Sequence, residues 1–174
     1  MYPLFAQDYG AVEFVENKGQ WDNRVRFAAK ATAGGIFLHN NGFTILQHHP
    51  KDWETITNLV HEQRTAKETI LGQLKVRSHA YSVAFVNASS NAVIVPDKSQ
   101  TTYNNYFIGN DHRKWASNCK IYGGITVKDI YPGVDVRYYS NNGQMKYDLI
   151  VSPGADVSKI VLKYSGVDKL DLKN

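Results

Sequence analysis

The sequence predicts an all-β protein, specifically an antiparallel β-sandwich of about ten strands with one or two short helices. Apolar and polar residues alternate with the two-residue period of a β-strand in many short segments. Two pairs of these segments are joined by Asn-Gly, the dipeptide that favours the type I′ turn of a β-hairpin. The chain is also 43 % hydrophobic and 12 % aromatic, a composition typical of a folded protein rich in strand-forming residues.

The clearest hairpin covers residues 134–151, with Asn142-Gly143 as its turn. This turn sets Arg137 opposite Asp148 on the polar face, while valines, a leucine and two tyrosines oppose one another on the apolar face. A turn one residue earlier would keep the faces but set Arg137 against Lys146, which is a like-charge pair. The charges therefore select the register that has Asn142-Gly143 in the loop.

The N-terminal part of the chain contains a second predicted hairpin, at residues 36–47. Its turn is predicted at Asn41-Gly42, which would set Leu38 opposite Ile45. A short apolar run at residues 11–15 and a predicted strand at residues 25–29 precede this hairpin.

Residues 48–72 differ from their surroundings because they are polar and lack the strand period. Apolar residues at helical spacing predict a helix from Trp53 to about His61, with Asp52 as its N-cap. We interpret the whole segment as a polar insertion between strands. An insertion of this length is a candidate functional loop, although such loops also vary within families without having a functional role.

Strand patterns return after the insertion. Pro96 is predicted to end a strand, because proline has no backbone N–H to donate to a sheet. Asp111 is predicted to cap one helical turn at His112–Ala116, which would present Trp115 to the body of the protein. The other strands predicted here are at residues 74–86, 92–95, 103–108, 121–130 and 159–164.

A chain of 174 residues with this pattern suits one domain, which we place at residues 11–174. Residues 1–10 are interpreted either as the remnant of a cleaved signal peptide, with Ala6 the last residue removed, or as a disordered N-terminus. A further pattern begins at Leu170–Leu172 and is cut off at the C-terminal end, which indicates truncation from a longer chain.

Composition argues against several classes of protein. The net charge is only +4 and the basic residues are scattered, so no nucleic-acid partner is expected. No apolar stretch reaches the ~18 residues that a membrane helix needs, so no membrane insertion is expected. Cys119 is the single cysteine, which excludes an intramolecular disulfide.

Four segments together resemble a known family. They are Phe14–Trp21, Tyr106–Asp111 with Lys114-Trp115, Tyr131–Asp135, and Lys146–Val151 with Pro153–Asp156. They are similar to the N-terminal domain of unknown function of secreted Bacteroidetes surface proteins. In those proteins the domain precedes SBBP (β-propeller-type) repeats, often with PKD-like modules and a type IX secretion sorting signal. The resemblance implies an extracellular or outer cell-surface location, downstream repeat domains as partners in the same chain, and genuine signal cleavage after Ala6; it assigns no catalytic residue.

The histidines and the acidic residues are the candidate metal ligands of the sequence, and each also has an ordinary structural role to fill. The six histidines lack the spacing of converging zinc ligands, so no metal residues are assigned. Calcium is the alternative left open, because four acidic residues cluster around the main hairpin and its turns: Asp129, Asp135, Asp148 and Asp156. Ion pairing and turn formation explain part of this cluster without an ion, and no other cofactor is expected.

A glycan hydrolase is the least favoured interpretation. Asp135 and Asp148 share the polar face of the main hairpin, where a glycosidase could use two carboxylates. Arg137 lies between them, however, and an ion-paired carboxylate has a lowered pKa, which is wrong for a general acid. No catalytic residue is assigned, and the protein is not expected to be an enzyme.

Exposed aromatic residues suggest a binding role instead. Tyr139 lies on the polar face, and with Asp135, Arg137 and Asp148 it forms the candidate ligand-binding set. The three tryptophans are interpreted as core plugs or loop anchors. We therefore expect a non-catalytic structural or interaction module of an exported, multi-domain cell-surface protein, of the kind used in adhesion. The alternative is a carbohydrate-binding module, with or without calcium, whose ligand would be a surface glycan; a protein ligand fits the first interpretation.

Overall fold

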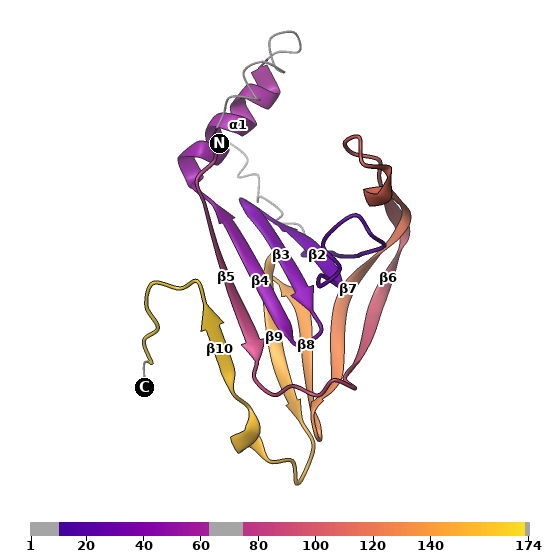
Figure 1. The fold of residues 1–174 in the computed structure, drawn as a ribbon, viewed down its shortest axis with the longest axis vertical. Helices are drawn as coiled ribbons and strands as arrows, with labels where there is room; N and C mark the ends of the chain where they lie inside the picture. The colour runs from indigo at the N-terminus through magenta and orange to yellow at the C-terminus, as the bar shows by residue number, and fades with distance from the viewer. Residues whose placement is uncertain (1–10, 63–74, 173–174) are drawn as a thin grey trace, which may run out of the picture.

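The computed structural model describes residues 11–62 and 75–172 (Figure 1). Within these residues the chain forms ten strands, one α-helix and two 3₁₀ turns. The elements are β1 (Phe14–Glu16), β2 (Phe27–Ala31), β3 (Gly34–His39), β4 (Gly42–His48), α1 (Pro50–Glu62), β5 (Ser78–Phe85), β6 (Val93–Tyr106), η1 (His112–Lys114), β7 (Ala116–Tyr131), β8 (Val134–Asn141), β9 (Gln144–Val151), η2 (Val157–Lys159) and β10 (Leu162–Ser165).

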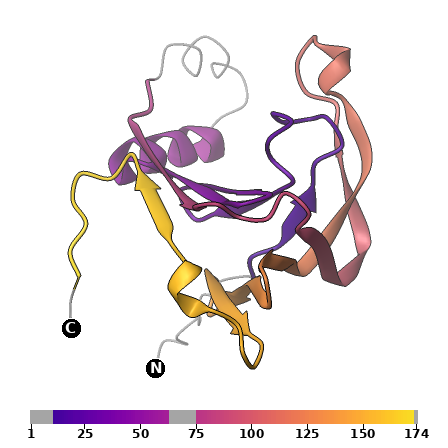
Figure 2. The same cartoon turned by 60° about the horizontal axis from the view of Figure 1, so that its bottom comes forward.

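All ten strands belong to one antiparallel sheet, in the order β10-β5-β4-β3-β2-β1-β7-β8-β9, with β6 on the other edge of β7. The sheet curls into a half-barrel, so that its two halves face each other as the layers of a sandwich do (Figure 2). The predicted all-β class is confirmed. Between the halves lies the main core: Val12, Phe14, Phe27, Ala29, Ile36, Leu38, Phe43, Val83, Phe85, Ile125, Val127, Ile130, Tyr131, Val134, Val136 and Tyr138.

The short strand β1 joins the two halves of the sheet. It pairs with β2 on one side and with β7 on the other, where Phe14 lies opposite Tyr122. Because successive residues of a strand point to opposite faces, Phe14 enters the main core. Its neighbour Val15 packs on the other face, in a smaller cluster with Cys119 and Ile121.

The main hairpin is confirmed in detail. β8 and β9 pair with Val134 opposite Val151 and Arg137 opposite Asp148. The turn residues Asn142 and Gly143 have φ values of +50° and +71°, as a type I′ turn requires. Sequence pattern and charge pairing were therefore sufficient to fix this register.

The predicted register of the second hairpin is wrong, because the turn lies one residue earlier in the chain than predicted. The loop is Asn40-Asn41, so that Ile36 lies opposite Ile45, and Gly42 is the first residue of β4. Gly42 has φ +155°, and a Cβ atom added there would lie 2.1 Å from the backbone oxygen of Val83 in β5. Gly42 is therefore required in β4, where this strand approaches β5, and it is not a residue of the turn.

Pro96 does not end a strand, contrary to the prediction. β6 continues through it to Tyr106 and joins two predicted strands into one, with irregular pairing between Ser99 and Tyr103. β6 pairs with β7 alone among the described strands. A proline is tolerated there because an edge strand leaves half of its backbone groups without a partner in the sheet.

The predicted helix is confirmed, but its N-terminus is not. α1 begins at Pro50, whose fixed φ and missing N–H suit the first helical position. Asp52 lies inside the first turn, where its carboxylate accepts hydrogen bonds from the backbone N–H (2.9 Å) and the guanidinium (2.7 Å) of Arg77. The residue predicted to cap the helix instead fastens it to the segment that leads into β5.

We expect acidification below about pH 4 to loosen the start of α1. Hydrogen bonds from Arg77 hold the pKa of Asp52 well below its usual range. A carboxyl whose pKa is lowered by folding stabilises the folded state above its unfolded pKa, and this contribution is lost progressively as the pH falls. The amide of Trp53, which donates to the His49 carbonyl, should therefore lose hydrogen-exchange protection between pH 5 and pH 2. In Asp52→Asn the protection should be low at both pH values; equal protection in the native protein would contradict the expectation.

Asp111 caps the 3₁₀ turn η1 as predicted, accepting a hydrogen bond from the Arg113 backbone. Trp115 does not pack on the body of the protein. It is 39 % exposed, its indole N–H donates to the Gly109 carbonyl, and its ring meets Phe107 edge to face at 5.6 Å. The tryptophan thus holds together the tip of the β6–β7 hairpin, which makes it a loop anchor.

Some predictions lie outside the described residues. These are the two interpretations of residues 1–10, the end of the polar insertion at 63–72 and the predicted strand start at Leu74. Residues 166–172, where a further pattern was expected, form no helix or strand. Among the described helices none has the length and hydropathy of a membrane span.

Candidate functional site

The four predicted ligand-binding residues lie on the face of β8 and β9 opposite the core, but they do not form one site. Tyr139 and Asp148 are brought together: the Tyr139 hydroxyl donates to Asp148, and this hydrogen bond raises the pKa of Tyr139. Asp135 is held elsewhere, 2.6 Å from the Lys128 ammonium. Burial alone would raise the pKa of Asp135, but the hydrogen bonds from Lys128 and the Asp129 N–H keep it below its usual value.

Arg137 forms its ion pair with Asp97 of β6 rather than with Asp148, at 2.7 Å. The guanidinium reaches across β7 over Gly124. A Cβ atom added to Gly124 would lie 2.4 Å from Asp97 Oδ1 and 3.1 Å from Arg137 Nη2. Gly123-Gly124 in the middle of a strand was the sequence signal for such a close approach.

The histidines and aspartates that the structure describes show no converging ligand set. Among the described residues, no group of three or more His, Cys, Asp or Glu is placed to hold a metal ion. His48 stacks on Trp53 of α1 at 5.1 Å, and His49 lies 3.7 Å from Asp52. Asp156 caps η2 by accepting hydrogen bonds from Ser158.

A groove of about 520 Å³ lies on the outer face of β1, β2 and β3, where β6 and β7 border it. Its three aromatic side chains are Trp21, Phe37 and Tyr106, and its polar side chains are Glu13, Lys30 and Asn104. Trp21 and Tyr106 meet nearly edge to face, with ring centroids 5.1 Å apart. Each aromatic is only partly buried, so the groove presents ring surface to solvent.

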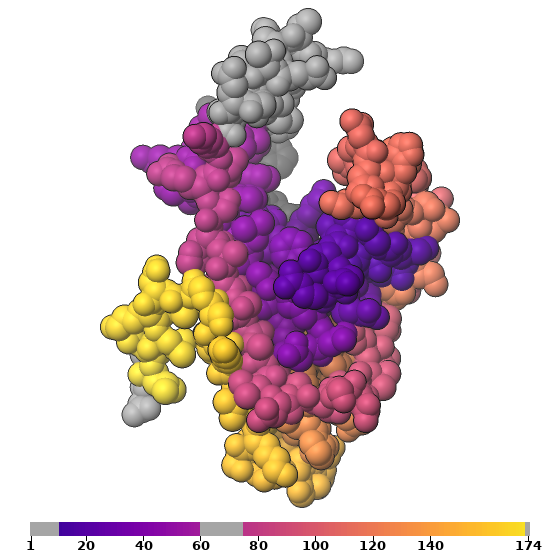
Figure 3. All heavy atoms as spheres, viewed as in Figure 1, coloured from indigo at the N-terminus to yellow at the C-terminus, as the bar shows by residue number. Residues whose placement is uncertain are grey.

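The loop between β1 and β2 positions Trp21 through the side chain of Asn17. The Asn17 amide nitrogen donates to the carbonyls of Asp22 and Val25, and its oxygen accepts from the N–H groups of Gly19 and Trp21. One partly buried side-chain network therefore shapes the whole loop. Figure 3 shows this loop beside the tip of the β6–β7 hairpin, where Lys18 donates to the Ser117 carbonyl at 3.1 Å.

Sequence reasoning missed the groove, because its aromatics come from three distant segments. Trp21 was interpreted as a plug or anchor, and it does pack on the smaller apolar cluster. Phe37 lies in a strand whose core residues are its two neighbours, Ile36 and Leu38. The alternation of β3 placed Phe37 on the outer face, which was the available signal.

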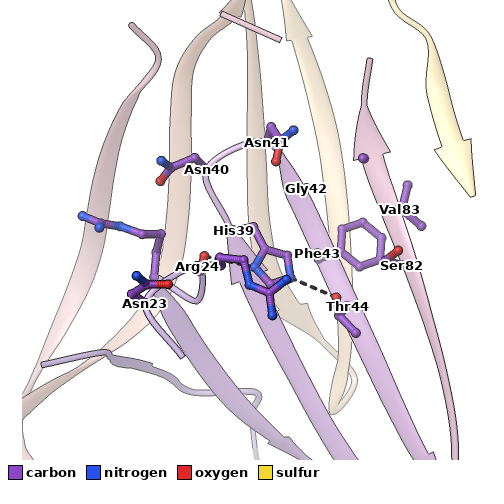
Figure 4. Close-up of a pocket in the computed structure, with 12 residues that line it drawn as sticks. Asn23, Arg24, His39, Asn40, Asn41, Gly42, Phe43, Thr44, Ser82 and Val83 are labelled. Atoms are coloured by element: carbon purple, nitrogen blue, oxygen red, sulfur yellow. Dashed lines mark hydrogen bonds between the residues drawn. The ribbon is translucent and has the colours of Figure 1, made fainter. Parts of the chain in front are cut away.

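A second concave surface of about 470 Å³ lies on the outer face of β3, β4 and β5 (Figure 4). It is polar and basic where the groove is aromatic. Its lining is Asn23, Arg24, Arg26, His39, Asn40, Asn41, Gly42, Phe43, Thr44, Ser82, Val83 and Ala84. His39 is fixed between two partners: one ring nitrogen lies 3.1 Å from the Arg24 carbonyl and the other 2.9 Å from the Thr44 hydroxyl.

A family described as "Domain of unknown function (DUF7948)" matches residues 14–174, a range that includes all four segments on which the resemblance rests. This match confirms the expectation of a domain of unknown function. No curated protein and no solved structure matches the chain. Since the match covers most of the sequence, the chain belongs to the DUF7948 family of domains of unknown function.

Proposed function

We propose that the domain is a non-catalytic interaction module of an exported, multi-domain cell-surface protein. The export and the downstream repeat domains rest on the resemblance described above. The aromatic groove of Trp21, Phe37 and Tyr106 is the observation that carries a binding role.

The distribution of carboxylates favours binding over hydrolysis. Glycoside hydrolysis uses two carboxyl groups across one groove, and Glu13 is the single carboxylate among the described residues that line this one. Asp135 and Asp97 are each ion-paired on other parts of the sheet. Neither is placed to act as the second carboxyl group.

The ligand class that the groove favours is carbohydrate, which makes a carbohydrate-binding module the more specific proposal. Sugar rings stack their C–H faces on aromatic side chains, and Trp and Tyr offer both an apolar ring and a polar group. Asn104, Lys30 and Glu13 at the rim supply donors and acceptors for hydroxyl groups. The volume of about 520 Å³ lies within the range of pockets that take small ligands.

Trp21→Ala is expected to weaken retention of the domain on a glycan that it binds by about tenfold or more, as for a central aromatic contact. The ligand would be found on a glycan array and insoluble polysaccharides, with calcium and again with chelator. Tyr106→Ala should act in the same direction, because both rings line the groove.

Two tyrosines outside the groove lining provide the controls. Tyr103 is 55 % exposed on the same strand as Tyr106, and Tyr139 lies on β8. Retention lost on Tyr139→Ala but kept on Trp21→Ala would move the site to the main hairpin. Loss of retention with chelator would add calcium to the site. Release of reducing sugar, abolished by one carboxylate substitution, would contradict the non-catalytic proposal.

A further inference from the structure

The basic pocket beside the hairpin turn of β3 and β4 is lined by arginine and histidine side chains, which the aromatic groove lacks. Two arginines and a histidine line it, and none of the lining residues is acidic. Amide and hydroxyl groups from Asn40, Asn41, Thr44 and Ser82 surround these basic groups. Such a lining suits a ligand that is both anionic and rich in hydroxyl groups.

The two arginines of the pocket differ in their ion pairing. Arg24 is bound by Asp22, with Nε–Oδ1 at 2.9 Å and Nη2–Oδ2 at 3.1 Å, which uses two of its five N–H donors. Arg26 forms no ion pair with any residue in the described ranges. Its backbone N–H donates to the Leu38 carbonyl at 2.8 Å, which fixes it at the entrance to β2. Arg26 therefore supplies the charge of the pocket that no described acidic residue offsets.

The wall behind these arginines is held firmly. The carbonyl of Arg24 can only accept, so His39 donates to it from Nδ1, and His39 Nε2 lies 2.9 Å from the Thr44 hydroxyl. Gly42 brings β4 close to β5 at the same point. A wall held in this way needs little rearrangement when a ligand binds, which favours affinity.

The pocket and the aromatic groove are neighbours on one face of the sheet. Phe37 lines the groove, and the two residues paired with it in adjacent strands are Ala28 and Thr44. Ala28 lines the groove and Thr44 lines the pocket. A chain-like ligand lying across β3 would contact both surfaces.

We infer that this pocket binds the oxyanion of an acidic saccharide, either a carboxylate or a sulfate group. The inference rests on the carbohydrate-binding function proposed above and specifies the class of glycan. Arginine suits this task because its planar fork of N–H groups matches the oxygens of a carboxylate or sulfate. The asparagine, threonine and serine side chains would contact the neighbouring hydroxyl groups.

The test compares three oligosaccharides of equal length, one neutral, one carrying uronic acids and one carrying sulfate esters, by isothermal titration calorimetry. At low salt the domain should bind one of the acidic oligosaccharides at least roughly tenfold more tightly than the neutral one. The preference should shrink with added salt, since it is electrostatic. Whichever of the two acidic oligosaccharides binds more tightly identifies the oxyanion as a carboxylate or a sulfate.

Arg26→Gln should remove most of this preference and leave the affinity for the neutral oligosaccharide unchanged. The matched pair Arg24→Gln and Arg113→Gln sharpens the test, because both arginines bind an aspartate two residues before them at 2.9 Å and only Arg24 lines the pocket. Arg24→Gln should weaken acidic binding, and Arg113→Gln should not. All three side chains are exposed, so the variants should keep the native unfolding midpoint.

Equal affinity for the neutral and acidic oligosaccharides would overturn the inference and leave the carbohydrate-binding proposal standing. A preference for acidic ligands that Arg113→Gln reduces as much as Arg26→Gln would also overturn it, because the effect would then follow net charge. Absence of binding to every saccharide would overturn both proposals.

Discussion

Gly42→Ala should destabilise the domain by more than about 3 kcal/mol, because the substitution places a side-chain atom where backbone already lies. The new Cβ would be 2.1 Å from the Val83 oxygen and 2.9 Å from the Ala84 Cα. Backbone atoms of a paired strand cannot move away singly, so β4 and β5 would have to separate. The φ of +155° adds strain for any residue with a side chain.

Urea unfolding followed by tryptophan fluorescence measures this loss. Gly154→Ala is the matched control, because Gly154 also has positive φ, at +84°, but nothing lies within 4 Å of the added atom. Gly154→Ala should lower the free energy of unfolding by only about 1 kcal/mol, because a residue with a side chain is strained at positive φ. Equal losses in the two variants would show that conformation, and not the approach of β5, makes Gly42 necessary.

Gly42 also explains why one Asn-Gly hairpin was predicted correctly and the other was not. Around Asn142-Gly143, the position of Arg137 opposite Asp148 and the alternation of both strands agree with the turn, and the structure follows the local pattern. At Asn41-Gly42, the glycine serves a contact with Val83, forty-one residues later in the chain. A local pattern carries no information about a strand that joins the sheet from so far away.

The polar face of the main hairpin shows the same limit for side chains. The pairing of Arg137 with Asp148 was predicted from two strands, and these residues do lie opposite each other. The ion pair nevertheless forms with Asp97, because β6 and β7 bring a second carboxylate within reach. Local pairing therefore predicts register well, but it cannot choose between partners when further strands are added to the sheet.

The candidate site could not be predicted from the sequence as a unit. Trp21, Phe37 and Tyr106 come from a loop, a central strand and an edge strand, and the curl of the sheet brings them together. Alternation along β3 marked Phe37 as outward-facing. Nothing in the local sequence showed that the β6–β7 hairpin would border the same face.

Phe14→Ala should lower the free energy of unfolding by about 3–5 kcal/mol, the usual cost of removing a fully buried phenylalanine ring. Phe14 has no exposed surface and belongs to the main core. It lies on β1, which has three residues and links β2 to β7. With so few backbone pairs, β1 depends on the burial of its side chains to hold the two halves of the sheet together.

The position of Phe14 therefore predicts more than a loss of stability. In native-state hydrogen exchange, Phe14→Ala should reduce protection in β2 and in β7 near Tyr122, the elements that flank β1, more than in the β8–β9 hairpin. Phe107→Ala is the control, because that ring is 59 % exposed at the hairpin tip and its loss should cost less than about 1 kcal/mol. Uniform loss of protection across all strands would mean that the sheet opens as one unit. In that case Phe14 would be a general core residue, and β1 would not be the point where the two halves separate.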